Sequence, residues 1–246
     1  MLIAQKKQSK PAPAQQGGSK KAEKDADVPF KTGEKLNFQV LFSKFTVKAG
    51  ALEFAIVEHR DFFGRSTWHL RATAHSVDTV RALYALDDQF DSYTDAARLT
   101  TLQYEMYLRE AGKKEDHTWR MDTGEDPVPN GVTAARVVPG TRDPLGFLYV
   151  LRTTDWKKTN EVRSPVFDGQ HLYDVQAQLV QPKGSVTVPN GHYNASQVRV
   201  RVFQNGKELK DTGFSVWLAD DSSRTPVLIE ADLPVGSARV ELTGKM

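Results

Sequence analysis

The chain has 246 residues, of which 39% are hydrophobic and 26% charged, a composition that suits a large globular domain with a proper core. Residues 1–28 hold six lysines against three acidic residues, so the rest of the chain keeps a net charge of −1 (the total of +2 less +3). A near-neutral folded part argues against a nucleic-acid-binding face. The absence of cysteine excludes disulfides, thiolate catalysis and cysteine–zinc sites.

Residues 1–28 predict a disordered basic tail, because a segment without aromatic residues cannot bury enough apolar surface to offset its chain entropy. Its apolar start, Met1–Ala4, is shorter than the ~7–15 apolar residues of a signal peptide. We therefore expect either a cytoplasmic protein or a start inside a longer signal sequence. No run approaches the ~20 apolar residues of a membrane helix. Residues 29–246 are expected to form a single β-rich domain, ordered from about Phe30.

A three-stranded meander is predicted over residues 35–75. Apolar residues alternate with mostly polar ones in each strand, as in Leu36, Phe38 and Val40, which is typical of a strand with one buried face. The turn at 61–65 carries two aromatic residues, Phe62 and Phe63, that we expect to be exposed.

Residues 77–86 change to helical spacing and predict a short helix. A strand follows near 90–94, and residues 102–108 pair with 117–122 across a turn at 111–114. Residues 124–131 contain too many breakers for regular structure.

A second helix is predicted over residues 143–152. Asp143 is a good N-cap and Pro144 suits the first helical position. The residues that follow are apolar nearly all round, which indicates a helix buried on several faces. Arg152 has two interpretations, stabilising the helix C-terminus or pairing with a carboxylate at the barrel mouth, and we favour the first.

The C-terminal half predicts further strands near 173–179, 198–202, 214–218, 227–233 and 238–242, with a hairpin at Asn205–Gly206. The total of roughly ten to twelve strands with short turns predicts an all-β, mainly antiparallel fold. We expect a curved open barrel or half-barrel sheet with one or two short helices, the one at 143–152 plugging its concave side.

Four segments spread along the chain carry a resemblance to a known family: 29–36, 47–53, 143–152 and 216–227. Together they resemble the bacterial domain of unknown function 3108 family. The resemblance implies an exported, envelope-located β protein, often with a signal peptide, and a fold similar to the open barrels of periplasmic lipoprotein carriers. It carries over no catalytic residue.

The histidine and aspartate residues that could act as metal ligands or catalytic groups are better explained by structural roles. The six histidines lack metal-binding spacing, and we expect no metal and no cofactor; they are His59, His69, His75, His117, His171 and His192. Asp220–Asp221 and the junction at Asp87–Asp88 are typical of turns. No nucleophile or phosphate-binding motif is present.

The leading hypothesis is a non-enzymatic periplasmic or cell-envelope protein with an apolar groove for a lipid-like or acylated ligand, a lipoprotein included. The predicted groove residues are Leu145, Phe147, Leu148, Tyr149, Arg152, Trp68 and Trp217. A packed core without a cavity is the open alternative. A scaffold that binds an envelope partner through Phe62 and Phe63 is the second hypothesis. A glycan hydrolase, which needs two carboxylates about 5–10 Å apart, is the third.

Overall fold

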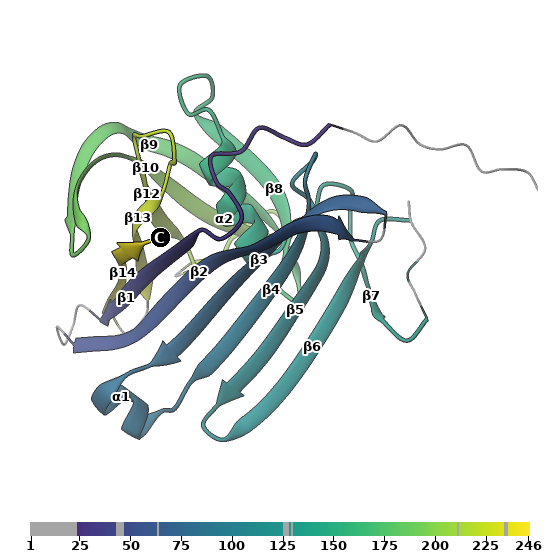
Figure 1. The fold of residues 1–246 in the computed structure, drawn as a ribbon, viewed down its shortest axis with the longest axis horizontal. Coiled ribbons are helices and arrows are strands. Elements are labelled where there is room, and N and C mark those ends of the chain that lie inside the picture. Colours follow the sequence, from purple (N-terminus) through teal and green to yellow (C-terminus); the bar gives the residue numbers. More distant parts are fainter. Residues whose placement is uncertain are drawn as a thin grey trace, which may run out of the picture.

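The computed structural model describes residues 24–42, 47–62, 64–124, 128, 130–210, 212–233 and 236–246. Nearly all of its regular structure is one continuous sheet, in the order β7-β6-β5-β4-β3-β2-β1-β14-β13-β12-β10-β9-β8, with β11 paired to β10 (Figure 1). The strands are β1 (Lys35–Phe42), β2 (Val47–Phe62), β3 (Arg65–Ser76), β4 (Asp87–Asp95), β5 (Thr101–Glu110), β6 (Lys113–Asp122), β7 (Thr133–Arg136), β8 (Glu161–Phe167), β9 (Leu172–Val188), β10 (Gly191–Gln204), β11 (Lys207–Glu208), β12 (Phe214–Ala219), β13 (Pro226–Leu233) and β14 (Gly236–Lys245).

The sheet is antiparallel except where β7 runs parallel to β6. The first and last strands along the chain lie side by side in the middle of the sheet, because β1 pairs with β14. The sheet curves round but is not closed into a barrel, since β7 and β8 end its two edges. The segment around Arg142 bridges to β8: its N–H donates to the Pro165 carbonyl at 3.0 Å, and its carbonyl accepts from the Phe167 N–H at 2.8 Å. The all-β, open-barrel prediction is confirmed.

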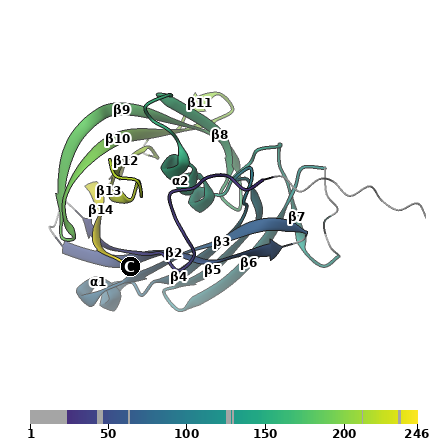
Figure 2. The ribbon, with the colours of Figure 1, turned by 45° about the horizontal axis from the view of Figure 1, so that its top comes forward.

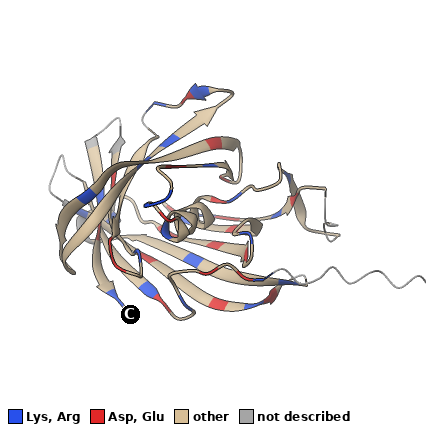
Figure 3. Cartoon of the chain, turned by 90° about the horizontal axis from the view of Figure 1, so that it is seen from above, with Lys and Arg blue, Asp and Glu red and all other residues tan. Residues whose placement is uncertain are grey.

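Helix α2 (Pro144–Thr153) lies inside the curve, between β8–β10 on one side and β2–β6 on the other (Figure 2). Its N-cap is Asp143, whose carboxylate accepts the Gly146 N–H at 2.9 Å. All residues from 145 to 152 are buried. Seen from above, the helix sits in the middle of the strands (Figure 3). The predicted plug is therefore confirmed, with the predicted cap.

Helix α1 (Asp78–Leu83) connects β3 to β4 at the rim of the sheet that lies away from α2 (Figure 1). It is shorter than the predicted helix at 77–86, because Tyr84 is already extended and Leu86 forms a bridge with Glu110. Leu83 is 85% exposed, so this helix contributes little to the core.

Several elements differ from the sequence prediction. The sequence analysis does not predict the short strands β7 and β8. Strand β7 has only four residues, and β8 has seven with Pro165 among them, so the alternation of apolar and polar residues is weak in both. Strand β9 extends to Val188 and strand β10 begins at Gly191, so the two strands form one long hairpin. Ordered contacts also begin before Phe30: the Ala26 N–H donates to the Ala96 carbonyl at 2.8 Å. Residues 1–23, and most of the breaker-rich stretch 125–129, lie outside the described residues.

Candidate functional site

The predicted groove residues on α2 and β3 belong to a packed core. Leu145, Phe147, Leu148 and Tyr149 are at most 8% exposed, and so is Trp68. Phe30, from the segment before β1, inserts between them, with its ring 5.4 Å from Trp68 and 5.1 Å from Tyr149 in edge-on geometry. These are favourable aromatic contacts. The space around the helix is thus filled by side chains from the protein itself.

Arg152 forms a buried ion pair with Glu34. Its guanidinium donates to the two carboxylate oxygens at 2.6 and 3.0 Å and to the Ser223 carbonyl at 3.0 Å. Arg152 is 0% exposed and Glu34 is 6% exposed. Arg152 therefore pairs with a carboxylate, as in the second interpretation, and it also lies in the last turn of α2, where the first interpretation placed it. Glu34 went unnoticed in the sequence because its partner lies 118 positions away.

The guanidinium of Arg152 also lies over two aromatic rings, 5.3 Å from Phe30 and 5.2 Å from Tyr149. Cation–π contacts of this kind gain strength when they are desolvated. The C-terminal end of α2 is thereby fixed to the start of β1.

The N-terminal end of α2 is fixed by Asp143, which is fully buried. Its carboxylate accepts hydrogen bonds from the hydroxyls of Ser92 and Thr101, the latter at 2.6 Å. Burial raises the pKa of this carboxyl above its ordinary value, against the opposing effect of these hydrogen bonds. The helix is therefore held to β4 and β5 by a buried polar network.

Beyond the end of α2, the concave face of the sheet becomes progressively more exposed toward the rim that carries α1. On β1, Leu36 and Phe38 are 1% and 2% exposed, whereas Val40 and Phe42 on the same face are only partly buried. Neighbouring strands repeat this gradient in register. The apolar residues on this face that are only partly buried are here called the open-end surface; they are Val40, Phe42, Leu52, Ala74, Phe90, Met106, Val202, Phe214, Ile229 and Val240.

Trp217 lies elsewhere. It alternates on β12 with the buried Val216 and Leu218, so its side chain points to the opposite face of the strand. Its Nε1 donates to Glu230 at 3.1 Å, and its ring lies against Gly184, where there is no room for a Cβ. The structure thus does not bring Trp217 together with the other predicted groove residues, because neighbouring residues of a strand point to opposite faces of the sheet.

Phe62 also lies on the outer face. It is half-buried, with its ring stacked 4.5 Å from Tyr93 and the Arg120 guanidinium 5.5 Å above it. Phe63 lies outside the described residues. An interaction role for these two residues stays a prediction.

The titratable side chains singled out in the sequence have structural partners. Buried His69 bonds to Asp91 at 2.5 Å, on the outer face of the sheet. Asp221 accepts the Ser223 and Arg224 N–H groups at 2.9 and 3.1 Å, as expected of a turn. Asp88 instead accepts the Arg109 N–H at 2.8 Å, between two strands. Within the described ranges, no three histidine or acidic side chains are grouped as metal ligands.

Neither helix that the structure describes is long and apolar enough to cross a membrane.

Comparison with known structures supports the open-barrel architecture. A beta-barrel-like protein of domain of unknown function DUF1849 from Brucella abortus aligns with a TM-score of 0.57 at 10% identity, covering 87% of this chain and 97% of that one. This likeness shows the fold alone. Two others align with a TM-score of 0.40: a predicted exported protein with a YmcC-like fold from Bacteroides fragilis, at 11% identity, and a predicted lipoprotein from Parabacteroides distasonis, at 10%. Each alignment covers 89% of this chain, with 98% of the former protein and 97% of the latter.

Sequence comparison gives the family. No curated protein matches this chain. The model of the family described as "Protein of unknown function (DUF3108)" matches residues 37–243, which is most of the chain. The resemblance carried by the four sequence segments is thereby confirmed, and this chain belongs to the DUF3108 family.

Proposed function

We propose that this protein is a non-enzymatic protein of the cell envelope that binds an acyl chain of a lipid-like or acylated ligand on the open-end surface. The observation that carries the proposal is the exposure gradient of the concave face. Side chains of the same apolar character are fully buried at the end of the concave face that holds α2 and only partly buried at the other end. The ligand site therefore lies beyond the helix rather than around it.

The chemistry of this surface favours an apolar ligand. Partly buried aromatic and aliphatic groups, among them Phe90, Met106 and Phe214, come from strands on both halves of the sheet. Ligand sites for apolar molecules are concave and lined mainly by such groups. Each CH₂ removed from water contributes about 0.8 kcal/mol, so a chain of several methylenes would gain appreciable binding energy there.

The packing at the other end of the barrel also supports this location. Aromatic rings and the Arg152–Glu34 pair fill the volume around α2. Because a packed interior resists displacement, opening that region would cost the contacts that fix the helix. The open-end surface offers apolar area without this cost.

The test is displacement of a fluorescent fatty-acid probe from the purified protein, together with native mass spectrometry. Leu52→Glu places a charge on the open-end surface and is expected to weaken probe binding by at least about tenfold, since a charge beside an acyl chain is strongly unfavourable. Val57→Glu is the matched control on the same strand, because Val57 is 39% exposed and lies outside the open-end surface.

Circular dichroism should show that both variants keep the β fold. Probe binding lost in Leu52→Glu and retained in Val57→Glu supports the proposal. Absence of probe binding by the parent protein, or equal binding by both variants, contradicts it.

A further inference from the structure

The rim that borders the open-end surface carries three exposed apolar residues at the end of α1. They are Ala82, Leu83 and Tyr84, here called the α1 knob. Leu83 is 85% exposed, the highest value among the large hydrophobic side chains that the structure describes, and Tyr84 is 44% exposed. A single exposed leucine is ordinary on a protein surface. Here three consecutive residues share this exposure beside a surface that is itself apolar, and contiguous exposed apolar area marks contact sites.

The α1 knob lies close to the proposed acyl site. Helix α1 connects β3 to β4, and both strands carry residues of the open-end surface near this connection (Figure 1). Ala74 lies two residues before the end of β3, and Phe90 is the fourth residue of β4. A ligand that reaches the open-end surface across this rim therefore passes the α1 knob.

The backbone on either side holds the α1 knob in place. Before the helix, the Val77 N–H donates to the Ala49 carbonyl on β2 at 3.2 Å. After it, the Ala85 carbonyl accepts the N–H of Ala111, in the β5–β6 turn, at 2.8 Å. The exposure of Leu83 is therefore a property of an anchored element, and a contact made through it needs little ordering of the backbone.

The charged residues on either side of the α1 knob in the chain, Arg81 and Asp87, neutralise each other. The guanidinium donates to the two carboxylate oxygens at 2.9 and 2.7 Å. The Tyr84 hydroxyl donates to Glu110 at 2.5 Å. These pairings favour neither an acidic nor a basic partner. They suit a zwitterionic lipid layer, where leucine enters the hydrocarbon and tyrosine rings lie at the level of the headgroups.

We infer that the α1 knob inserts into the interfacial layer of a phospholipid bilayer and so brings the open-end surface to the source of its acyl ligand. This inference rests on the proposed function and names where the ligand comes from. An acyl chain then moves between bilayer and protein with little exposure of its methylene groups to water. The attachment is weak and reversible, since even a single myristoyl chain binds a membrane only marginally.

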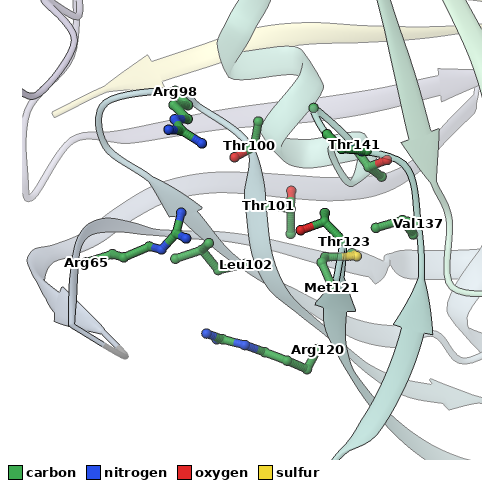
Figure 4. A pocket seen from close by; sticks show the side chains of 12 residues that line it. Arg65, Arg98, Thr100, Thr101, Leu102, Arg120, Met121, Thr123, Val137 and Thr141 are labelled. Carbon is green, nitrogen blue, oxygen red and sulfur yellow. The ribbon is translucent and has the colours of Figure 1, made fainter. Parts of the chain in front are cut away.

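The opposite rim provides a matched control, Val138. Strand β6 begins beside the β5–β6 turn on the α1 side and ends at Asp122 on the far side, where the Asp122 carbonyl accepts the Val137 N–H at 3.0 Å. The adjoining Val138 is 49% exposed. A pocket of about 140 Å³ lies at this rim, and its lining includes Val137, Arg65, Arg98 and Arg120 (Figure 4). Val138 is therefore an exposed apolar residue far from the α1 knob.

Because the chain contains no cysteine, one fluorescent label can be placed at a chosen position of the full chain. Leu83→Cys and Val138→Cys are each labelled with an environment-sensitive dye and mixed with phosphatidylcholine vesicles. The emission of the dye in Leu83→Cys is expected to shift to the blue, and that in Val138→Cys should not change. Without a label, Leu83→Asp should weaken vesicle binding by at least about tenfold, because burial of a leucine side chain is worth at least that factor. Val138→Asp should keep vesicle binding.

The fatty-acid probe separates this inference from the proposed function. Leu83 is not part of the open-end surface, so Leu83→Asp should bind the probe like the parent protein. A blue shift in Leu83→Cys alone, with vesicle binding lost in Leu83→Asp, supports the inference. No shift in Leu83→Cys, or equal shifts in both labelled variants, overturns it even when the probe binds. A shift that grows with protein concentration in the absence of lipid indicates a second copy of this chain on the α1 knob and also overturns it. Vesicle binding through the α1 knob without any probe binding supports the membrane contact and contradicts only the proposed function.

Discussion

The buried pair between Arg152 and Glu34 predicts that Glu34→Gln destabilises the fold far more than its small chemical change suggests. Both residues are almost fully buried, at 0% and 6% exposure, and each carboxylate oxygen of Glu34 accepts a hydrogen bond from the guanidinium. The glutamine keeps the shape but removes the charge, which leaves a buried guanidinium uncompensated. Breaking a buried pair from one side costs about 3–5 kcal/mol.

For a domain of this size, each kcal/mol lowers Tm by about 2–4 °C, so Glu34→Gln should lower Tm by about 6–20 °C. A neighbouring pair provides the control. Lys35 and Glu53 are 3.4 Å apart with side chains 48% and 29% exposed, so Glu53→Gln should change stability by no more than about 1 kcal/mol.

Denaturant unfolding followed by circular dichroism measures both variants, with the slope m checked for constancy. Arg152→Met and the double variant complete a cycle, in which the double variant should be less destabilised than the sum of the two single ones, because neither unpaired charge remains. If Glu34→Gln and Glu53→Gln had equal stability, or if the single effects simply added, the buried pair would not be what fixes α2 to β1.

Two further predictions concern backbone space and pH. Gly169→Ala should destabilise by about 2–4 kcal/mol, because φ is +103° and a Cβ would lie 2.8 Å from the Trp119 ring. Gly33→Ala, with φ +85° and open space, should lose only about 1–2 kcal/mol in the same unfolding assay, and equal losses would contradict the role of Trp119. Burial raises the pKa of the Asp143 carboxyl, so its contribution to stability is full below the unfolded-state pKa of about 3.9 and is lost as pH rises through the folded-state pKa. Asp143→Asn should therefore remove a fall in stability with rising pH, and unchanged pH profiles would refute this assignment.

The local elements of this fold could be predicted from the sequence because their signals lie within a few residues. The alternation in 35–75 indicated three strands, and Asp143–Pro144 before an apolar run indicated the start of α2; both are observed. Short or irregular pieces gave weaker signals. Strand β7 has four residues, and Pro165 interrupts the pattern of β8, so their pairing at the sheet edges had to come from tertiary contacts.

The sites depended on tertiary structure, because their members are far apart in the chain. Composition and periodicity by themselves determined the all-β class, the buried helix and its cap, since these follow from side-chain polarity at fixed spacing. Only the folded chain decided that Glu34 neutralises Arg152, that Trp217 points away from Val216, and that Arg65, Arg98 and Arg120 share one pocket. The curvature and register of a long sheet bring these residues together, and those arise from pairings across the whole chain that local spacing does not encode.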